Sequence, residues 1–226
     1  MVIFTGGSWA VGEWKYHQLS GHGVAYYFGI CSGEPVVNLS ASSIGNIEQV
    51  QRIQSLLTKY TPDESDQFYW LVHNPLVDVP IEKFYQGQNS LTDSVTNALH
   101  TQLAFANQVA TDHKITIQLI GASCDLDSVS INQYNHLRTV VPSWGKLLDL
   151  EFPASIFSHQ TDRLPELHKA LQQHRPDLLD EFNKISGLAF SKRRAMVLAT
   201  DMFHSFHPTS LAHKHLSDHL ATTYIQ

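Results

Sequence analysis

The chain has 226 residues, a length that suits one domain built around a single sizeable core. Hydrophobic residues make up 42% of the sequence and charged residues 16%, so the composition is globular with a weakly charged surface. With a formal net charge of −6 and scattered basic residues, the sequence leaves no extended basic surface for nucleic acid.

Short apolar runs alternate with amphipathic segments in the first half of the chain, a pattern typical of a parallel sheet covered by helices on both faces. Strands are predicted at residues 2–5, 35–39, 67–73 and 114–120, and a weaker fifth strand is expected within residues 121–160. The predicted fold is a three-layer α/β/α sandwich in the doubly wound style, with a parallel sheet of about five strands in a single domain.

Apolar residues recur every three or four positions between and after these strands, which predicts helices. The helices are expected at residues 47–60, 90–112 and 208–223, and residues 164–182 carry a helical spacing that is broken at Pro176. Asn46 is expected to cap the first, Ser90 or Thr92 to cap the second, and Pro208 to lie in the first turn of the last. Residues 184–199 are either a further helix or an excursion over the functional site.

The two cysteines, Cys31 and Cys124, cannot form a disulfide framework and are expected to be free buried thiols, which favours a reducing compartment. The first residues lack the basic and apolar regions of a signal peptide, and no apolar run reaches the roughly 18 residues that a membrane helix needs. We therefore expect a cytoplasmic protein with neither nucleic acid nor membrane as a partner. Its oligomeric state is left open.

The strongest local signal is a strand that runs directly into two glycines and a serine, Phe4-Thr5-Gly6-Gly7-Ser8-Trp9. Parallel α/β sheets bind ligands at the carboxyl ends of their strands, so Ser8 is expected to face the crevice. Gly7 and Gly12 have the spacing of a phosphate-binding P-loop, but Glu13 and Trp14 stand where lysine and a hydroxyl residue are required. Taken alone, this segment is also compatible with a turn that merely joins a strand to a helix.

The second signal is a run of one acid and two histidines before the last predicted helix, Asp201-Met202-Phe203-His204-Ser205-Phe206-His207-Pro208. A histidine can take the proton of a serine hydroxyl, and a carboxylate can hold the histidine in the correct tautomer. The Asp-x-x-His spacing selects Asp201 with His204, whereas the His-Pro pair that enters the helix selects His207.

These two blocks, GGSW near the start and Asp-x-x-His or His-Pro near the end, resemble those of the SGNH (GDSL-like) hydrolase superfamily over nearly the whole chain. The resemblance implies a flavodoxin-like SGNH hydrolase fold and a serine esterase or deacylase that acts without a metal or other cofactor. It implies Ser8 as the nucleophile, His207 as the general base and Asp201 as the group that orients it, with His204 as the rival base. The sequence departs from the family at Gly7, where an aspartate is usual.

The resemblance also implies an oxyanion hole. Its donors are the backbone N–H of Ser8, a backbone N–H near Ser42 or Gly45 in the block after the second strand, and the side chain of Asn74 after the third. A backbone donor needs no particular side chain. Trp9 is a candidate to line a substrate cleft beside Ser8, and Trp14 is expected in the core.

Two other classes of function stay open. Possible metal ligands are dense near the end of the chain, at Asp201, His204, His207, His213, His215 and His219. His215 and His219 would share a helix face as zinc ligands do, but no His-Glu-x-x-His pattern is present, so the histidines of the last helix are expected to be solvated. The alternatives to an enzyme for small-molecule or acylated substrates are therefore a metal-dependent hydrolase and a catalytically inactive binding protein on the same fold.

Overall fold

A computed structural model describes residues 1–12, 22–75, 78, 91–122, 124–148, 164–180, 182–183, 203–204 and 207–224. Five strands form one parallel sheet in the order β2-β1-β3-β4-β5. They are β1 (Val2–Gly6), β2 (Val36–Asn38), β3 (Gln67–Val72), β4 (Ile117–Gly121) and β5 (Leu137–Val141). The prediction of a parallel sheet, including its weaker fifth strand, is confirmed.

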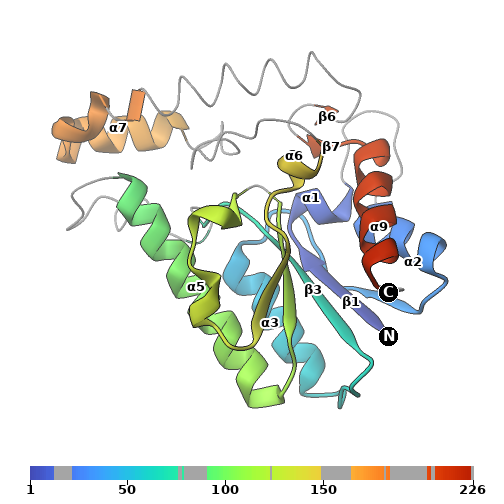
Figure 1. The fold of residues 1–226 in the computed structure, drawn as a ribbon. Coiled ribbons are helices and arrows are strands. Elements are labelled where there is room, and N and C mark those ends of the chain that lie inside the picture. The colour runs from blue at the N-terminus through green and yellow to red at the C-terminus, as the bar shows by residue number, and fades with distance from the viewer. Residues whose placement is uncertain are drawn as a thin grey trace.

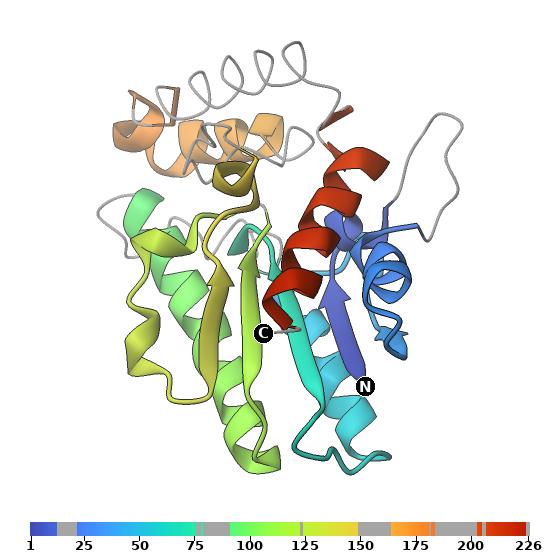
Figure 2. The same ribbon diagram turned by 45° about the vertical axis from the view of Figure 1, so that its right-hand side comes forward.

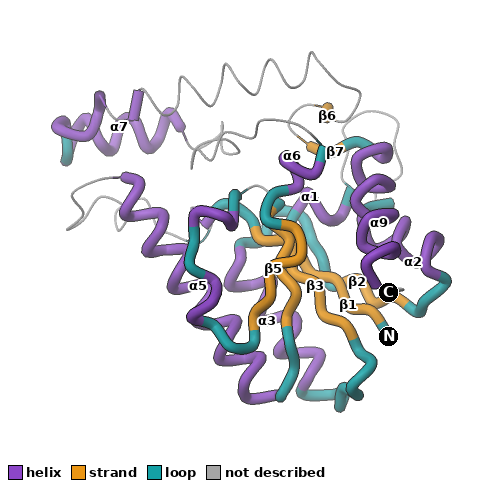
Figure 3. Tube along the Cα trace, in the orientation of Figure 1, coloured by secondary structure: helices purple, strands orange, loops and turns teal. Residues whose placement is uncertain are grey.

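Helices cover both faces of the sheet, so the three-layer α/β/α prediction is confirmed as well (Figures 1 and 3). On one face lie α2 (Val24–Ser32) and α9 (Ser210–Tyr224), and on the other lie α3 (Asn46–Leu57) and α5 (Leu91–His113). The other helices are α1 (Ser8–Val11), α6 (Trp144–Leu147) and α7 (Leu164–His174). Turns of 3-10 helix lie at Leu126–Ser128, Ile131–Gln133 and Pro176–Leu178. The two-residue strands β6 (Phe203–His204) and β7 (His207–Pro208) form an antiparallel pair.

The central strands are apolar on both sides because each side faces a helical layer. Successive residues of a strand point to opposite faces. Accordingly, Phe4 and Tyr69 stack at 5.0 Å between ring centroids in the core beneath α2 and α9, whereas Ile3 and Trp70 belong to the core beneath α3 and α5. Successive residues of β1 and β3 thus pack against the helices on opposite faces of the sheet.

The helices α2 and α9 pack side by side although they come from opposite ends of the sequence (Figure 2). The Ser217 hydroxyl donates to the Val24 carbonyl across this interface, at 2.9 Å. Sequence periodicity did not predict α2, because its residues Val24–Ser32 are apolar nearly all round and show no amphipathic stripe. Among the described residues, no helix is both long and apolar enough to span a bilayer.

Two predicted helix starts are wrong in detail. The N-cap of α3 is Gly45 rather than Asn46, because the Asn46 side chain turns into the core and the carboxylate of Asp78 accepts from the Ile47 N–H at 3.2 Å instead. Pro208 belongs to β7, and α9 begins at Ser210, where Thr209 Oγ1 accepts from the Ala212 N–H at 3.3 Å. The predicted cap Ser90, the segment 184–199 and Trp14 lie outside the described residues.

The order of the strands fixes where a ligand can enter. The chain leaves β1 towards β2 on one side and then crosses to β3 on the other side, so the connections diverge between β1 and β3. In open α/β sheets, ligands bind in the crevice that this divergence creates at the carboxyl ends of the strands. Gly7 and Ser8 follow β1 at this crevice, and His73 and Asn74 follow β3.

Candidate active site

Ser8 lies at the carboxyl end of β1, where the strand turns into α1. The Gly7 carbonyl accepts from the N–H groups of Ala10 at 2.9 Å and Val11 at 3.3 Å, which closes the first turn of α1. Gly12 ends this helix in the left-handed conformation, with φ of 76°, which favours glycine. Ser8 is therefore the first helical residue on a short, tightly bounded turn, and it is half-buried.

The loop after β2 runs beside this turn. The Leu39 N–H donates to the Phe4 carbonyl at 2.7 Å, and the Ala41 N–H donates to the Gly6 carbonyl at 3.1 Å, so the loop continues the pairing of β2 with β1. Ser42 follows in a turn and is half-buried, and Gly45 is buried at the start of α3. The predicted donor positions around Ser42 and Gly45 thus belong to a loop anchored beside the end of β1.

The residues after β3 complete this edge of the sheet. His73 is 7% exposed and Asn74 is 2% exposed. The Gly7 N–H donates to His73 Nε2 at 3.0 Å, so the ring of His73 lies directly against the turn that carries Ser8. The predicted site residue Asn74 therefore directly follows His73, whose side chain contacts the Ser8 turn.

A buried polar network holds His73 in place. Asn46 Nδ2 donates to the His73 carbonyl at 2.8 Å, and the His73 N–H donates to Asn46 Oδ1 at 2.9 Å, so one side chain satisfies both backbone groups. Asn46 Nδ2 also donates to Gln102 Oε1 at 2.8 Å, and Gln102 Nε2 donates to Asp78 Oδ2 at 2.9 Å. These bonds tie the start of α3 and the loop after β3 to α5.

Asp78 is the charged end of this network. Burial raises the pKa of its carboxyl group, and this effect exceeds the opposing effect of hydrogen bonds from the backbone N–H groups of Ile47 and Asn46. The negative end of the side chain lies at the N-terminus of α3, where the helix dipole favours an anion. Asp78 therefore joins the loop after β3 to the first turn of α3.

The segment with the candidate histidines lies next to α1. The backbone of β7 contacts both α1 and α9, and Figure 1 shows β7 above the end of β1. His204 and His207 stand opposite each other in the antiparallel β6–β7 pair. The side chains of both histidines and all of Asp201 lie outside the described residues. The described backbone thus places β7, which contains His207, beside α1, which begins at Ser8.

An aromatic row runs from His73 to α9. Trp9 packs edge-on against His73, Trp144 packs edge-on against Trp9 at 5.8 Å between centroids, and His213 packs against Trp144 at 5.2 Å. Trp9 is 3% exposed and therefore a core residue rather than a cleft lining. The expectation that His213 is solvated is wrong. His213 is fully buried because it lies on the side of α9 that faces the sheet.

The other histidines of α9, His215 and His219, are exposed as expected. Within the part of the chain that the structure describes, no group of three histidine, cysteine or acidic side chains is arranged to hold a metal ion. The expectation of buried thiols is wrong for Cys31, which is exposed and donates to Asp218 Oδ1 at 2.8 Å, while Cys124 is half-buried.

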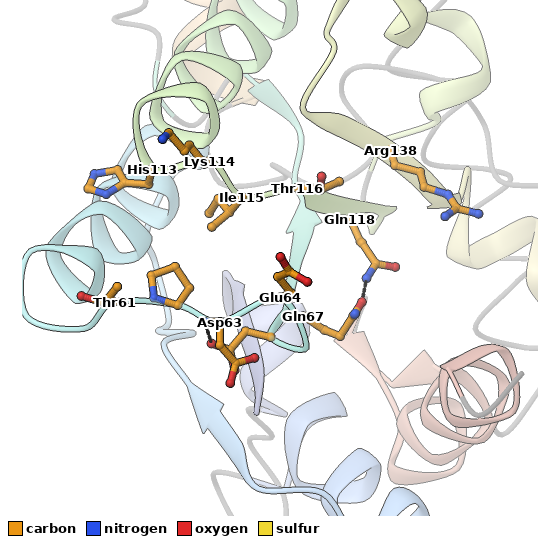
Figure 4. A pocket seen from close by; sticks show the side chains of 12 residues that line it. Thr61, Asp63, Glu64, Gln67, His113, Lys114, Ile115, Thr116, Gln118 and Arg138 are labelled. Atoms are coloured by element: carbon orange, nitrogen blue, oxygen red, sulfur yellow. Dashed lines mark hydrogen bonds between the residues drawn. The ribbon is translucent and has the colours of Figure 1, made fainter.

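A polar hollow of about 600 Å³ lies at the opposite edge of the sheet, where the strands begin (Figure 4). Most of the residues that line it are of polar or charged types, among them Asp63, Glu64, His113, Lys114, Gln118 and Arg138. Gln67, the first residue of β3, is hydrogen-bonded there to Gln118. None of the predicted site residues lines this hollow, so it is separate from the crevice beside Ser8.

The sequence did not lead us to predict that four residues, His73, Asn46, Gln102 and Asp78, form a buried polar network at the site. One signal for two of them was present: Asn46 and Gln102 are amides that fall on otherwise apolar helix stripes, next to Val50 in α3 and to Leu99 and Leu103 in α5. A polar side chain on a core-facing stripe needs a buried partner. Such an amide in an apolar stripe therefore indicates a buried polar network.

No protein-family model matches the chain, and no curated protein matches it. Among solved structures, it is similar to a lipolytic protein of the G-D-S-L family from Desulfitobacterium hafniense (12% identity, TM-score 0.45), with 98% of this chain and 97% of that chain covered. A member of the same family from Veillonella parvula has 13% identity and a TM-score of 0.45, with 100% and 98% covered. A carbohydrate esterase has 10% identity and a TM-score of 0.47, with 98% and 63% covered.

Proposed function

We propose that the protein is a serine hydrolase that cleaves ester bonds in small-molecule or acylated substrates. Ser8 attacks the acyl carbonyl, His207 accepts the serine proton and returns it to the leaving group, and Asp201 orients the imidazole. The supporting observation is the contact between β7, which contains His207, and α1, which begins at Ser8. Of these two segments, α1 follows β1 at the crevice between β1 and β3, where open α/β sheets bind their ligands.

The same edge of the sheet offers donors for the negative charge that develops on the carbonyl oxygen. We assign this role to the backbone N–H of Ser8, to N–H groups of the loop that contains Ser42 and Gly45, and to the side chain of Asn74. The loop is fixed beside β1 by the bond from the Ala41 N–H to the Gly6 carbonyl. Donors that are already held in place stabilise an oxyanion without reorganisation during the reaction.

The proposal is tested with an activated ester, p-nitrophenyl acetate, and with labelling of Ser8 by a fluorophosphonate. Ser8→Ala is expected to lower the hydrolysis rate by about a thousandfold or more and to abolish labelling, because the nucleophile is lost. His207→Ala is expected to lower the rate to a similar extent. If His204→Ala does so instead, His204 is the base.

Matched controls are Ser130→Ala and His215→Ala, which remove the same kinds of side chain at exposed positions outside the crevice. Both are expected to keep the wild-type rate. Hydrolysis that survives Ser8→Ala, or wild-type protein that neither hydrolyses the ester nor reacts with the fluorophosphonate, contradicts the proposal.

A further inference from the structure

His73 presents a fixed hydrogen-bond acceptor to the turn that carries Ser8. A backbone N–H can only donate, so the bond from the Gly7 N–H at 3.0 Å requires an unprotonated Nε2 on the His73 ring. The neutral ring then carries its proton on Nδ1. The contact therefore assigns one tautomer to His73.

The ring cannot move away from this position without breaking other contacts. Asn46, which is fully buried, binds both backbone groups of His73, and the edge of Trp9 packs against the ring. The backbone is thus held from the α3 side and the ring from the α1 side. A side chain held in this way is pre-organised for the bond that it makes.

Gly7 is glycine because of this ring rather than because of its backbone conformation. Its φ of −85° is ordinary for any residue. A Cβ at residue 7, however, would lie 2.9 Å from His73 Nε2, closer than real Cβ atoms approach, and 3.1 and 3.2 Å from two carbons of the ring, which is tighter than most such contacts. The absence of a side chain at Gly7 is what lets the histidine reach the N–H.

We propose that His73 is a positioning residue for the nucleophile, acting on Ser8 through the Gly7 peptide. This inference rests on the proposed serine hydrolase function. The bond fixes the peptide immediately before Ser8, and therefore the direction in which the serine hydroxyl and its N–H point into the crevice. Misplacement of a reacting group by about 1 Å is enough to slow an enzymatic reaction by about a hundredfold.

The first test compares His73→Gln with His73→Leu. The glutamine side chain can place an amide oxygen near the position of Nε2, whereas leucine fills similar space and accepts no hydrogen bond. His73→Leu is expected to lower kcat by about ten- to a hundredfold with KM changed by less than about threefold, and His73→Gln to retain most of the wild-type kcat. Equal losses in the two variants would overturn the positioning role.

The second test uses the steric relationship, which does not depend on whether His73→Leu folds. Gly7→Ala is expected to lower kcat because its methyl group collides with the ring, and His73→Ala to lower it because the acceptor is lost. The double variant should be no slower than the slower single variant, since both changes disrupt one contact. Losses that multiply in the double variant would show that the two residues act independently and would overturn the proposal.

A third measurement reads the bond itself and needs no turnover. Nitrogen NMR shifts of the His73 ring are expected to show the Nδ1–H tautomer, and the Gly7 amide to exchange slowly in wild type and His73→Gln but rapidly in His73→Leu. A ring protonated on Nε2 overturns the inference. His136→Gln, which replaces a histidine bonded to the Ile115 carbonyl near the start of β4, is the control and is expected to leave kcat and Gly7 exchange unchanged.

The outcomes separate the two proposals. Wild-type protein without hydrolysis or Ser8 labelling overturns the hydrolase itself, and the catalytic role of His73 falls with it. An active wild type with the Nε2–H tautomer, or with equal kcat in His73→Gln and His73→Leu, overturns only the positioning role.

Discussion

The carboxylate of Asp78 occupies the space into which a side chain at residue 45 would project. A Cβ on Gly45 would overlap Asp78 Oδ1, so the acid reaches the first turn of α3 only because residue 45 is glycine. Through this contact the loop after β3 is joined to the loop after β2. Both loops carry residues of the proposed oxyanion hole.

Gly45→Ala is therefore expected to lower the free energy of unfolding by about 1–3 kcal/mol, the usual effect of forcing extra atoms into a packed site. Urea unfolding measures the change. Gly29→Ala is the matched control. Gly29 lies within helix α2, where alanine is favoured over glycine, and a Cβ there would make an ordinary 3.4 Å contact with the Val36 side chain. Equal stability losses in the two variants would contradict the steric role of Asp78.

Asp78→Asn is expected to change how stability depends on pH. Burial raises the pKa of the Asp78 carboxyl in the folded state, so its protonation favours folding. This contribution is complete below the unfolded-state pKa of about 3.9 and is lost as the pH rises through the folded-state value.

The wild type should therefore gain free energy of unfolding relative to Asp78→Asn as the pH falls from about 7 to about 4. Urea unfolding of both proteins at several pH values gives this difference, in which the titration of all shared acids cancels. If the difference in free energy of unfolding between the two proteins is independent of pH, or is larger at neutral pH, burial does not destabilise the charged form of Asp78.

Asn46→Ala is expected to destabilise the fold by about 3 kcal/mol, because it leaves the backbone N–H and carbonyl of His73 and the amide oxygen of Gln102 without their partner. Asn38→Ala is the control, since Asn38 accepts one exposed bond, from the Ser40 N–H, and its loss is expected to cost less than about 1 kcal/mol. Thermal or urea unfolding distinguishes the two. A loss at Asn46 no greater than that at Asn38 contradicts a structural network at the site.

Asp218→Asn is expected to speed alkylation of Cys31 by iodoacetamide several-fold at neutral pH. Although Cys31 is exposed as a residue, some loss of solvent around its sulfur and the hydrogen bond to the Asp218 carboxylate both raise the pKa of the thiol, and the thiolate is the reactive form. Removing the carboxylate lowers that pKa. Mass spectrometry of the modified peptide measures the rate at Cys31 separately from Cys124, and an unchanged or slower rate would contradict the expectation.

Local sequence patterns predicted the features that depend only on neighbouring residues. The run from Phe4 to Ser8 contains its own strand and turn, and the structure has both. Asn46 has a side chain that suits an N-cap and lies where the helix starts, yet its side chain faces the core. The Ile47 N–H at the helix start donates instead to the carboxylate of Asp78, which lies 31 residues later in the sequence. A partner so distant leaves no local signal.

The same limit applies to the candidate site. Gly7 looked like a departure from a family pattern, whereas in three dimensions it accommodates a histidine 66 residues later. Periodicity also missed α2, which is apolar on nearly every side, although its apolar content is what suits it to lie against both the sheet and α9. Pairings of this kind depend on topology, which single-sequence patterns do not encode.

The bond between Ser217 and Val24 spans 193 residues, and it has a consequence for synthesis on the ribosome. Chains emerge N-terminus first, so α2 can pack on the face of the sheet that holds Phe4 and Tyr69 early, whereas the part of that face beneath α9 stays uncovered until the residues of α9 have been made. Because β7 directly precedes α9 in the sequence, the contact between β7 and α1 also forms late. A nascent chain would thus expose part of this apolar face to chaperones until α9 has been made.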